Sequence, residues 1–226
     1  MNIMVIGAYG KVGRLVVEQA LKRGHKVTGI ARHKHEDFDF ENIVVKDMYD
    51  MVKEDVAGMD AVVDAVSAWT PATVAVHYHG LLHVLFLLKN SVTRYIKVGG
   101  SNTLFIDENR TRILQQLPLY YPKYMQNLCD AHRLGLETLR KFSDVRWTYV
   151  TPAYKFAPLG PYTGHYHIDG EVFVPAKKDD PANGHNDYIS YADYSKGLID
   201  IIENGTYIRQ RITLVNGDIP DANLIW

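Results

Sequence analysis

The 226-residue sequence predicts an α/β fold built on a doubly wound parallel sheet, with a small substrate cap towards its C-terminal end. Three observations lead to this prediction. An apolar run at residues 2–6 ends in a glycine-rich turn, strand-like and helix-like patterns then alternate up to residue 152, and the last third changes character. Strands that alternate with helices form parallel sheets with right-handed crossovers, so we expect one continuous sheet.

The strands are predicted from short apolar runs, which are typical of buried parallel strands. The expected strands cover residues 2–6, 25–31, 43–45, 61–66, 95–98, 147–150 and 209–215. Thr151-Pro152 is expected to stop the strand at 147–150, because proline cannot donate a ladder hydrogen bond.

The helices are predicted from apolar residues that recur at helical spacing. Gly24 is expected to end the first of them, since glycine commonly follows the last turn of a helix. The expected helices cover residues 12–21, 73–89, 124–142 and 191–203.

The last third of the chain predicts a cap rather than a separate domain. Residues 165–168 and 171–174 flank Asp169-Gly170, the strongest short signal for a β-hairpin. No internal repeat or flexible linker interrupts the chain. We therefore expect all 226 residues to form a single domain, in which residues 1–152 are the core. Residues 153–226 are expected to be mostly substrate cap, together with the final helix and strand.

Composition and charge exclude several classes of protein. The net charge is −1 with both signs mixed along the chain, so neither nucleic acid nor a membrane surface is an expected partner. The single cysteine, Cys129, rules out an internal disulfide and fits a reducing compartment. No run of about 18 apolar residues is present, and the first apolar run leads directly into the glycine turn. We therefore expect a cytoplasmic protein without a membrane span or a signal peptide.

The glycine-rich turn lies between the first strand and the first helix and has the pattern G-x-x-G-x-x-G. Its residues are Gly7, Ala8, Tyr9, Gly10, Lys11, Val12 and Gly13. In dinucleotide-binding turns the first glycine permits the tight turn, the second admits the pyrophosphate, and the third lets helix and strand pack closely. The N-terminus of the helix then offers free N–H groups to the phosphates. This context predicts a dinucleotide site; the alternative is a β–α turn that binds nothing.

The end of the second strand favours NADP(H) over NAD(H). NAD sites usually place Asp or Glu there to bind the ribose, whereas an arginine accommodates the 2′-phosphate of NADP. This chain has Arg32-His33-Lys34-His35 at that point, and the first carboxylate after it is that of Glu36. Arg32 can pair bidentately with a phosphate, which a carboxylate would repel. The alternative is that Arg32 and Lys34 are solvated loop charges.

Several motifs together resemble the atypical short-chain dehydrogenases, and most closely the small NAD(P)H-binding proteins named NADH-flavin reductases. The motifs, in chain order, are the glycine turn, Arg32, Val98-Gly99-Gly100-Ser101, Trp147-Thr148-Tyr149-Val150-Thr151-Pro152 and Ile189-Ser190-Tyr191-Ala192-Asp193-Tyr194. The resemblance covers essentially the whole chain. It implies a Rossmann-type sheet in strand order 3-2-1-4-5-6 and a small C-terminal substrate region.

The resemblance also extends the expected cofactor site beyond the glycine turn and Arg32. It implies that Pro152 and Ala153 line the nicotinamide end of the site. The additional cofactor residues expected at strand ends are Ala65, Val66, Gly99, Gly100, Pro152 and Ala153.

One departure from the better-known short-chain dehydrogenases concerns proton transfer. Those enzymes use a Tyr-x-x-x-Lys pair, in which the lysine lowers the pKa of the tyrosine. Here the candidate tyrosines are Tyr120, Tyr121 and Tyr124, and none has a lysine four positions further on. Reduction of ordinary ketones is therefore not expected. The catalytic residues stay unassigned, with Ser101 and Tyr124 as candidates; Ser101 could equally be a loop or helix-cap serine.

Aromatic residues in the expected substrate loops indicate a planar acceptor. Tyr121, Tyr154 and Phe156 lie there, where their faces could stack on a flat ligand; alternatively, they fill the half-exposed edge of the cap. Flavins and quinones accept a hydride with little help, because they delocalise the charge. We therefore expect an NADPH-dependent oxidoreductase that acts on a small planar molecule such as a flavin or quinone. The alternative is a cofactor-binding sensor or interaction protein without turnover.

The histidines of residues 73–89 give little support for a metal site. His79 and His83 share one helical face, but His77 lies off that face and no carboxylate or cysteine in the segment completes a site. We expect no metal. Packing of this helix on the sheet or at a homodimer interface explains the segment better. Cys129 lies within a predicted helix and is expected to be a core residue.

Overall fold

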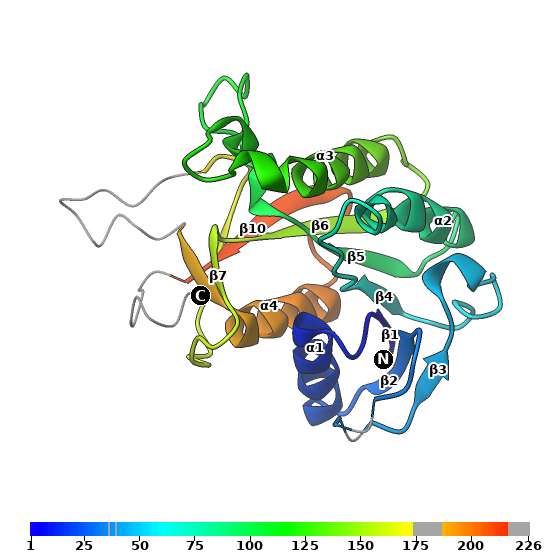
Figure 1. Ribbon diagram of the computed structural model, residues 1–226. Coiled ribbons are helices and arrows are strands. Elements are labelled where there is room, and N and C mark those ends of the chain that lie inside the picture. The colour runs from blue at the N-terminus through cyan, green and yellow to red at the C-terminus, as the bar shows by residue number, and fades with distance from the viewer. Residues whose placement is uncertain (36, 39, 174–186, 217–226) are drawn as a thin grey trace.

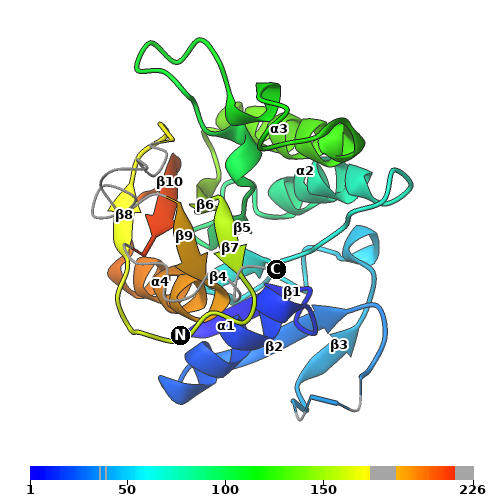
Figure 2. The ribbon, with the colours of Figure 1, turned by 60° about the vertical axis from the view of Figure 1, so that its left-hand side comes forward.

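The computed structural model describes residues 1–35, 37, 38, 40–173 and 187–216. The strands of its main sheet are β1 (Asn2–Ile6), β2 (Lys26–Ala31), β3 (Ile43–Val45), β4 (Ala61–Asp64), β5 (Arg94–Val98), β6 (Arg146–Pro152), β8 (His167–Asp169) and β10 (Gln210–Val215). They lie in the order β3-β2-β1-β4-β5-β6-β10-β8, and every neighbouring pair is parallel except β10 and β8 (Figures 1 and 2). This order confirms the predicted doubly wound, Rossmann-type sheet, which β10 and β8 extend beyond the sixth strand.

Helices cover both faces of the sheet. On one face α1 (Lys11–Lys22) and α4 (Tyr191–Asn204) pack against each other, and on the other face lie α2 (His79–Leu87) and α3 (Gln126–Arg140) (Figure 1). A second, two-stranded parallel sheet, formed by β7 (Lys155–Ala157) and β9 (Tyr188–Ser190), was not predicted from the sequence. Within the described ranges, no helix is long and apolar enough to cross a membrane.

Two buried apolar layers hold the helices to the sheet, because side chains alternate between the faces of each strand. In β1, Ile3 and Val5 belong to the layer shared with α1 and α4. Met4 and Ile6 belong to the layer shared with α2 and α3. Burial of each such side chain contributes roughly 1.5–3 kcal/mol, so β1 is fixed from both sides. The turn that follows β1 therefore starts from a rigid strand.

The segment predicted as one helix over residues 73–89 consists of two elements. A 3-10 turn spans Val74–His77, the backbone of Tyr78 departs from helical geometry at φ −124°, and α2 begins at His79. At the end of the 3-10 turn the imidazole of His77 is buried, and its Nε2 lies within hydrogen-bonding distance, 3.1 Å, of the carbonyl oxygen of Ala68.

The prediction that Thr151-Pro152 stops the sixth strand is wrong. Both residues lie in β6, where Thr151 pairs with Thr213 and Pro152 pairs with Leu214 of β10. Pro152 is the last residue of the strand, a position at which the missing N–H costs little.

The predicted hairpin across Asp169-Gly170 is also wrong within the described residues. β8 pairs antiparallel with β10, and Val172 forms a bridge with Phe105 instead of with β8. The edge of β10 offers a row of backbone hydrogen-bonding groups, and pairing with this edge outweighs the local turn signal. Val174, the last residue of the expected partner strand, lies outside the described residues.

Candidate dinucleotide-binding site

The glycine turn connects the end of β1 to the start of α1. Gly7 has φ +80°, a left-handed conformation that favours glycine, and its N–H donates to the carbonyl oxygen of Ile30 at 2.9 Å. The N–H of Gly10 donates to the carbonyl oxygen of Gly7 at 2.9 Å, which closes the turn. Backbone hydrogen bonds therefore hold the start of the turn to the end of β2 and close the turn.

The three glycines of the turn have different packing requirements. A Cβ on Gly13 would collide with the carbonyl oxygen of Gly7, so this glycine lets α1 pack directly on the turn. A Cβ on Gly10 would meet only the carbonyl oxygens of Gly7, at 3.1 Å, and Ala65, at 3.8 Å. The protein itself therefore does not fill the space beyond Gly10. This open approach to the backbone is what a bound pyrophosphate requires.

The N-terminus of α1 has the features of an anion-binding helix end. Gly10 is its N-cap residue, no side chain caps the helix, and its first turn carries no acidic residue. The first N–H groups of a helix lack intrahelical partners and carry the positive end of the helix dipole. An anionic phosphate group would satisfy both features.

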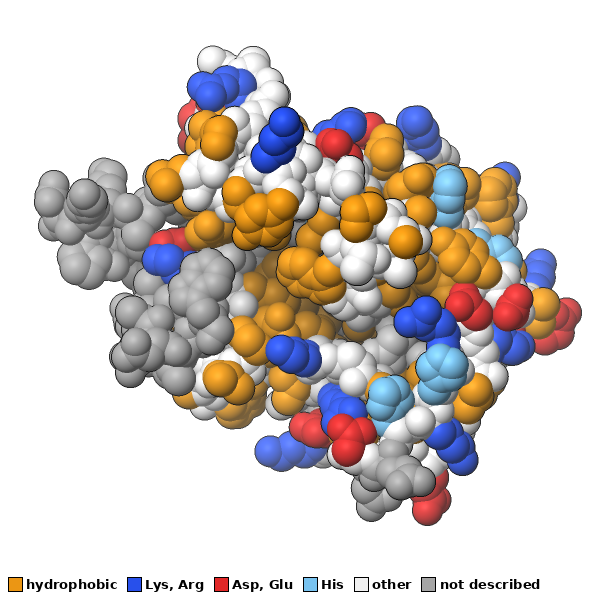
Figure 3. All heavy atoms as spheres, in the orientation of Figure 1, with side chains coloured by type: hydrophobic (Ala, Val, Ile, Leu, Met, Phe, Trp, Pro, Cys, Tyr) orange, Lys and Arg blue, Asp and Glu red, His pale blue; other side chains and the backbone are white. Residues whose placement is uncertain are grey.

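A cavity of about 610 Å³ opens beside this turn. It lies at the carboxyl ends of β1, β2 and β4, where the strand order reverses between β1 and β4, and ligands of open α/β sheets bind at such a point. Figure 3 shows hydrophobic side chains over the middle of this face and basic and histidine side chains towards β2 and β3. The predicted cofactor residues that line the cavity are Gly7, Tyr9, Gly10, Arg32, Ala65 and Val66.

Comparison with known proteins decides the type of ligand. Residues 7–204 match the family described as NAD(P)H-binding, and the match begins at the first glycine of the turn. The chain belongs to the NAD(P)H-binding family. Its cofactor is therefore a nicotinamide dinucleotide, and the glycine turn with its open Gly10 and uncapped α1 has the geometry to hold the pyrophosphate.

Several other proteins resemble the chain over nearly its whole length. "Uncharacterized protein YwnB" of Bacillus subtilis (strain 168) is 34% identical over 220 residues, which are 96% of this chain and 99% of YwnB. The structure of SP1627 from Streptococcus pneumoniae TIGR4, called "a putative NADH-flavin reductase", is 39% identical with a TM-score of 0.87 and covers 96% of this chain and 99% of its own. A protein from Lactobacillus casei is 26% identical with a TM-score of 0.83, over 96% of this chain and 100% of its own.

The remaining predicted cofactor residues of this NAD(P)H-binding protein do not line the cavity. Ala8 and Gly13 are buried beneath the turn, Val12 is partly buried, and Lys11 is exposed in the first turn of α1. The other four lie further along the same sheet edge, at the ends of β5 and β6. These residues are Gly99, Gly100, Pro152 and Ala153. Pro152 and Ala153, which the resemblance places at the nicotinamide end, thus lie beside the cavity rather than in it.

Two parts of the cavity wall were not predicted from the sequence: the segment after β3, and the residues that follow the predicted Ala65 and Val66 at the end of β4. One follows β3 and includes Asp47, whose side chain accepts a hydrogen bond from the N–H of Tyr49 at 3.0 Å. The other follows β4 and includes Trp69, whose side chain is 66% exposed and donates from Nε1 to Ser67 Oγ at 2.7 Å. The signal that could have found both walls is their position directly after parallel strands, whose carboxyl ends meet at one edge of the sheet.

The two catalytic candidates have different environments. Ser101 is buried, and its Oγ lies 2.6 Å from the hydroxyl oxygen of Tyr121. Burial raises the pKa of Tyr121, and the residue four positions further on is Met125 rather than a lysine. The Tyr124 side chain is 83% exposed. The raised pKa makes Tyr121 a weaker acid than an ordinary tyrosine, and Tyr124 lies at the surface.

The aromatic residues expected at the substrate pocket form two packed clusters. Tyr154 meets Tyr120 edge-on with 4.9 Å between ring centres and Tyr121 with 5.9 Å. Phe156 packs on Tyr191 at 4.0 Å. Tyr154 and Phe156 stay partly exposed, so the role of these residues in a substrate pocket remains a prediction.

A buried polar cluster lies behind the wall formed by the segment after β4. Lys97 Nζ lies 2.9 Å from a carboxylate oxygen of Asp64, and the hydroxyl of Tyr95 donates to the other oxygen at 2.6 Å. The ring of His77 packs against that of His132, with 4.3 Å between centres. Burial and, secondarily, the positive charge of Lys97 lower the pKa of His77 to about 4. His77 is therefore neutral at physiological pH.

The other histidines of this region have separate partners. The His79 ring packs on Tyr78, with 4.2 Å between ring centres, and His83 Nε2 lies 2.8 Å from the carbonyl oxygen of Met51. In the part of the chain that the structure describes, His, Cys, Asp and Glu residues form no group of three that could hold a metal. Cys129 is fully buried, which confirms its expected place in the core.

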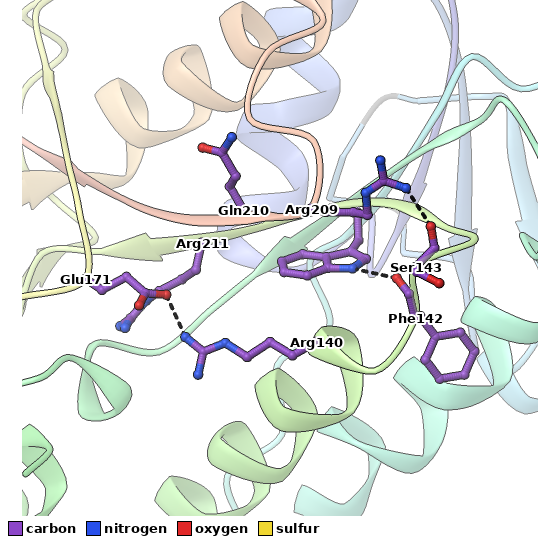
Figure 4. A pocket seen from close by; sticks show the side chains of 8 residues that line it. Arg140, Phe142, Ser143, Glu171, Arg209, Gln210 and Arg211 are labelled. Carbon is purple, nitrogen blue, oxygen red and sulfur yellow. Dashed lines mark hydrogen bonds and ion pairs between the residues drawn. The ribbon is translucent and has the colours of Figure 1, made fainter. Parts of the chain in front are cut away.

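A second groove, of about 410 Å³, lies near the amino ends of β6 and β10, away from the glycine turn (Figure 4). Its positive charges already have protein partners. Arg140 pairs with Glu171 at 2.6 Å, Arg209 donates to the carbonyl oxygen of Ser143 at 2.5 Å, and Arg211 donates to Thr151 Oγ1 at 2.9 Å. The arginines of this groove are therefore engaged by the protein itself.

Proposed function

We propose that the protein is an NADPH-dependent oxidoreductase that passes a hydride to a planar acceptor such as a flavin or a quinone. The NAD(P)H-binding family supports a nicotinamide cofactor, and the name of the similar S. pneumoniae protein supports a flavin acceptor. That name gives NADH rather than NADPH. The two cofactors differ in one phosphate, so the preference depends on the residues that would meet it.

The observation that carries the preference for NADPH is the position of Arg32. This residue follows β2, lines the cavity and is exposed, and it has no hydrogen-bond or ion-pair partner among the described residues. Its guanidinium is therefore free to form a bidentate pair with the 2′-phosphate. NADH lacks that phosphate and gains nothing from the same side chain.

We expect Arg32→Ala to weaken NADPH binding by roughly 1.5–3 kcal/mol, the range for a hydrogen bond to a charged group, and to leave NADH binding nearly unchanged. Isothermal titration calorimetry with both cofactors measures this difference. Lys34→Ala is the matched control, because Lys34 is exposed in the same loop but does not line the cavity. Equal losses for NADPH and NADH would refute the assigned role of Arg32.

In the proposed reaction the main task of the protein is to position the nicotinamide ring against the flat ring of the acceptor. When bound, NADPH supplies the hydride. The glycine turn and α1 hold the pyrophosphate, and the ends of β5 and β6 orient the nicotinamide end towards the partly exposed aromatic residues Tyr154 and Phe156. A tyrosine with an ordinary pKa near 10 is a poor acid at neutral pH, and burial raises the pKa of Tyr121 further. In this proposal the proton comes from solvent.

We therefore expect Tyr121→Phe to retain most of the turnover with a flavin or quinone. Tyr120→Phe and Tyr124→Phe should behave in the same way. Steady-state kinetics on the three variants, with the NADPH affinity measured separately, checks this. If any variant with intact cofactor affinity lost kcat by a hundredfold or more, the protein would contain a tyrosine acid and the proposed mechanism would be wrong.

The activity itself is tested by NADPH oxidation with a panel of flavins and quinones. The proposal expects oxidation that depends on both the acceptor and the enzyme. Tight NADPH binding without oxidation in the presence of any acceptor would instead favour a cofactor-binding sensor.

A further inference from the structure

The loop that carries Arg32 is attached to the glycine turn through Arg14. This arginine lies on α1, and its Nε donates to the carbonyl oxygen of Tyr9 at 2.9 Å. Its Nη2 donates to both carboxylate oxygens of Asp37, at 2.9 and 2.8 Å. One guanidinium therefore bonds the turn expected to bind pyrophosphate and the loop expected to bind the 2′-phosphate.

Aromatic contacts strengthen the same connection. The Arg14 guanidinium lies 5.1 Å from the ring centre of Phe38, within the range of a cation–π contact. The ring of Tyr9 packs on the ring of His35, with 4.7 Å between centres. The loop thus contacts Tyr9 of the turn through His35, and Arg14 of α1 through Asp37 and Phe38. These three loop residues follow Arg32 within six positions.

The Arg14–Asp37 pair lies beside the cavity but not in it. Tyr9 and Arg32 line the cavity, whereas Arg14 and Asp37 do not. The exposed fractions of the two side chains are 26% for Arg14 and 66% for Asp37. Exposed ion pairs usually contribute little to folding stability, so the stability of the protein does not explain an ion pair that reaches both carboxylate oxygens and is accompanied by two ring contacts.

We propose that Arg14 and Asp37 are positioning residues for cofactor specificity, which hold the loop after β2 where Arg32 meets the 2′-phosphate. This inference rests on the proposed preference for NADPH. If Arg32 is held in place before the cofactor arrives, less conformational freedom is lost on binding. The gain applies only to the cofactor that has a 2′-phosphate, and so the pair increases the ratio of NADPH affinity to NADH affinity.

The test compares Arg14→Gln, Asp37→Ala and the double variant by calorimetry with NADPH and with NADH. Asp37→Ala removes the contact to the loop and leaves the Arg14–Tyr9 bond in place, so it tests the loop alone. We expect each single variant to bind NADPH three- to tenfold more weakly and to bind NADH within twofold of wild type. The double variant should bind NADPH no more weakly than the weaker single variant, because Arg14→Gln already breaks the Arg14–Asp37 interaction that Asp37→Ala removes.

Two control variants separate the proposed positioning role from a general effect of losing an ion pair and from the preference for NADPH itself. Arg133→Gln alters an exposed ion pair with Glu137 on α3, 2.8 Å long and remote from the cavity, and should change neither affinity. Arg32→Ala tests the proposed function by itself. One outcome is that Arg32→Ala weakens NADPH binding alone, while the Arg14 and Asp37 variants bind NADPH as tightly as wild type. That result would support the preference for NADPH and contradict the positioning role of Arg14 and Asp37.

Three other outcomes would overturn the inference. Equal losses for both cofactors would indicate a general structural role. Additive losses in the double variant would indicate two independent effects. Tighter NADPH binding by Asp37→Ala would indicate that the Asp37 carboxylate repels the phosphate and that Arg14 only neutralises it.

Discussion

Gly10→Asp should abolish binding of NADPH and NADH alike. The Cβ and carboxylate of the new side chain would occupy the open space beyond the Gly10 backbone, where the pyrophosphate must approach. The added negative charge would also repel the phosphates at the positive end of α1. We expect a loss of at least roughly a hundredfold in affinity, which corresponds to about 2.8 kcal/mol.

Gly170→Asp is the matched control for this variant. Gly170 has an ordinary φ, nothing lies within 4 Å of the position of an added Cβ, and the residue is far from the glycine turn in the fold. Circular dichroism should show that both variants are folded, and calorimetry then compares their affinities. A folded Gly10→Asp protein with the affinity of wild type would contradict the assignment of the turn.

The free energy of unfolding should fall as the pH is lowered from about 7 to about 5. The pKa of His77 is lowered to about 4 by burial and then by Lys97, whereas a histidine in the unfolded chain titrates near 6.5. Between these values the unfolded state binds a proton that the folded state does not. Stability is therefore fully present above about pH 6.5 and decreases by about 1.4 kcal/mol per pH unit below it. Burial lowers the pKa of His132 as well, and its effect has the same sign.

His77→Gln separates this effect from other acid-labile interactions. An amide can still donate to the carbonyl oxygen of Ala68 but does not titrate. Urea unfolding at pH 5, 6 and 7 should give a pH dependence that is shallower than that of wild type by close to one proton. The lowered pKa values of Asp55 and Asp200 contribute only at lower pH, because unfolded carboxylates titrate near 4. Identical slopes for the variant and wild type would show that the pKa of His77 is the same in the folded and unfolded states, contrary to this account.

The core of the fold was predictable because its signals are local. The strand before Gly7 and the helix after Gly10 have apolar periodicities that depend on neighbouring residues alone. The spacing of the three glycines matches a backbone requirement that the structure confirms at Gly7 and Gly13. Alternating strands and helices predicted a parallel sheet. The order of the first six strands was implied by the resemblance to the atypical short-chain dehydrogenases, and the structure confirms it.

The features that were missed depend on contacts between distant parts of the chain. β8 pairs with β10 across more than forty residues of sequence. The strong local turn signal at Asp169-Gly170 instead predicted a hairpin between residues 165–168 and 171–174. The 2.6 Å contact between Ser101 and Tyr121 joins two loops, and no spacing rule links them. The cavity walls after β3 and β4 contain ordinary loop sequences, whose role follows only from their place at the sheet edge.

The central claim is that the cavity beside the glycine turn binds a nicotinamide dinucleotide and prefers the form with a 2′-phosphate. Calorimetric titration of the wild-type protein with NADPH and with NADH, in the same buffer, tests this claim most directly. We predict one NADPH bound per chain, with an affinity at least roughly tenfold higher than that for NADH, or about 1.4 kcal/mol. Binding of NADH as tightly as NADPH, or the absence of binding by either, would contradict it.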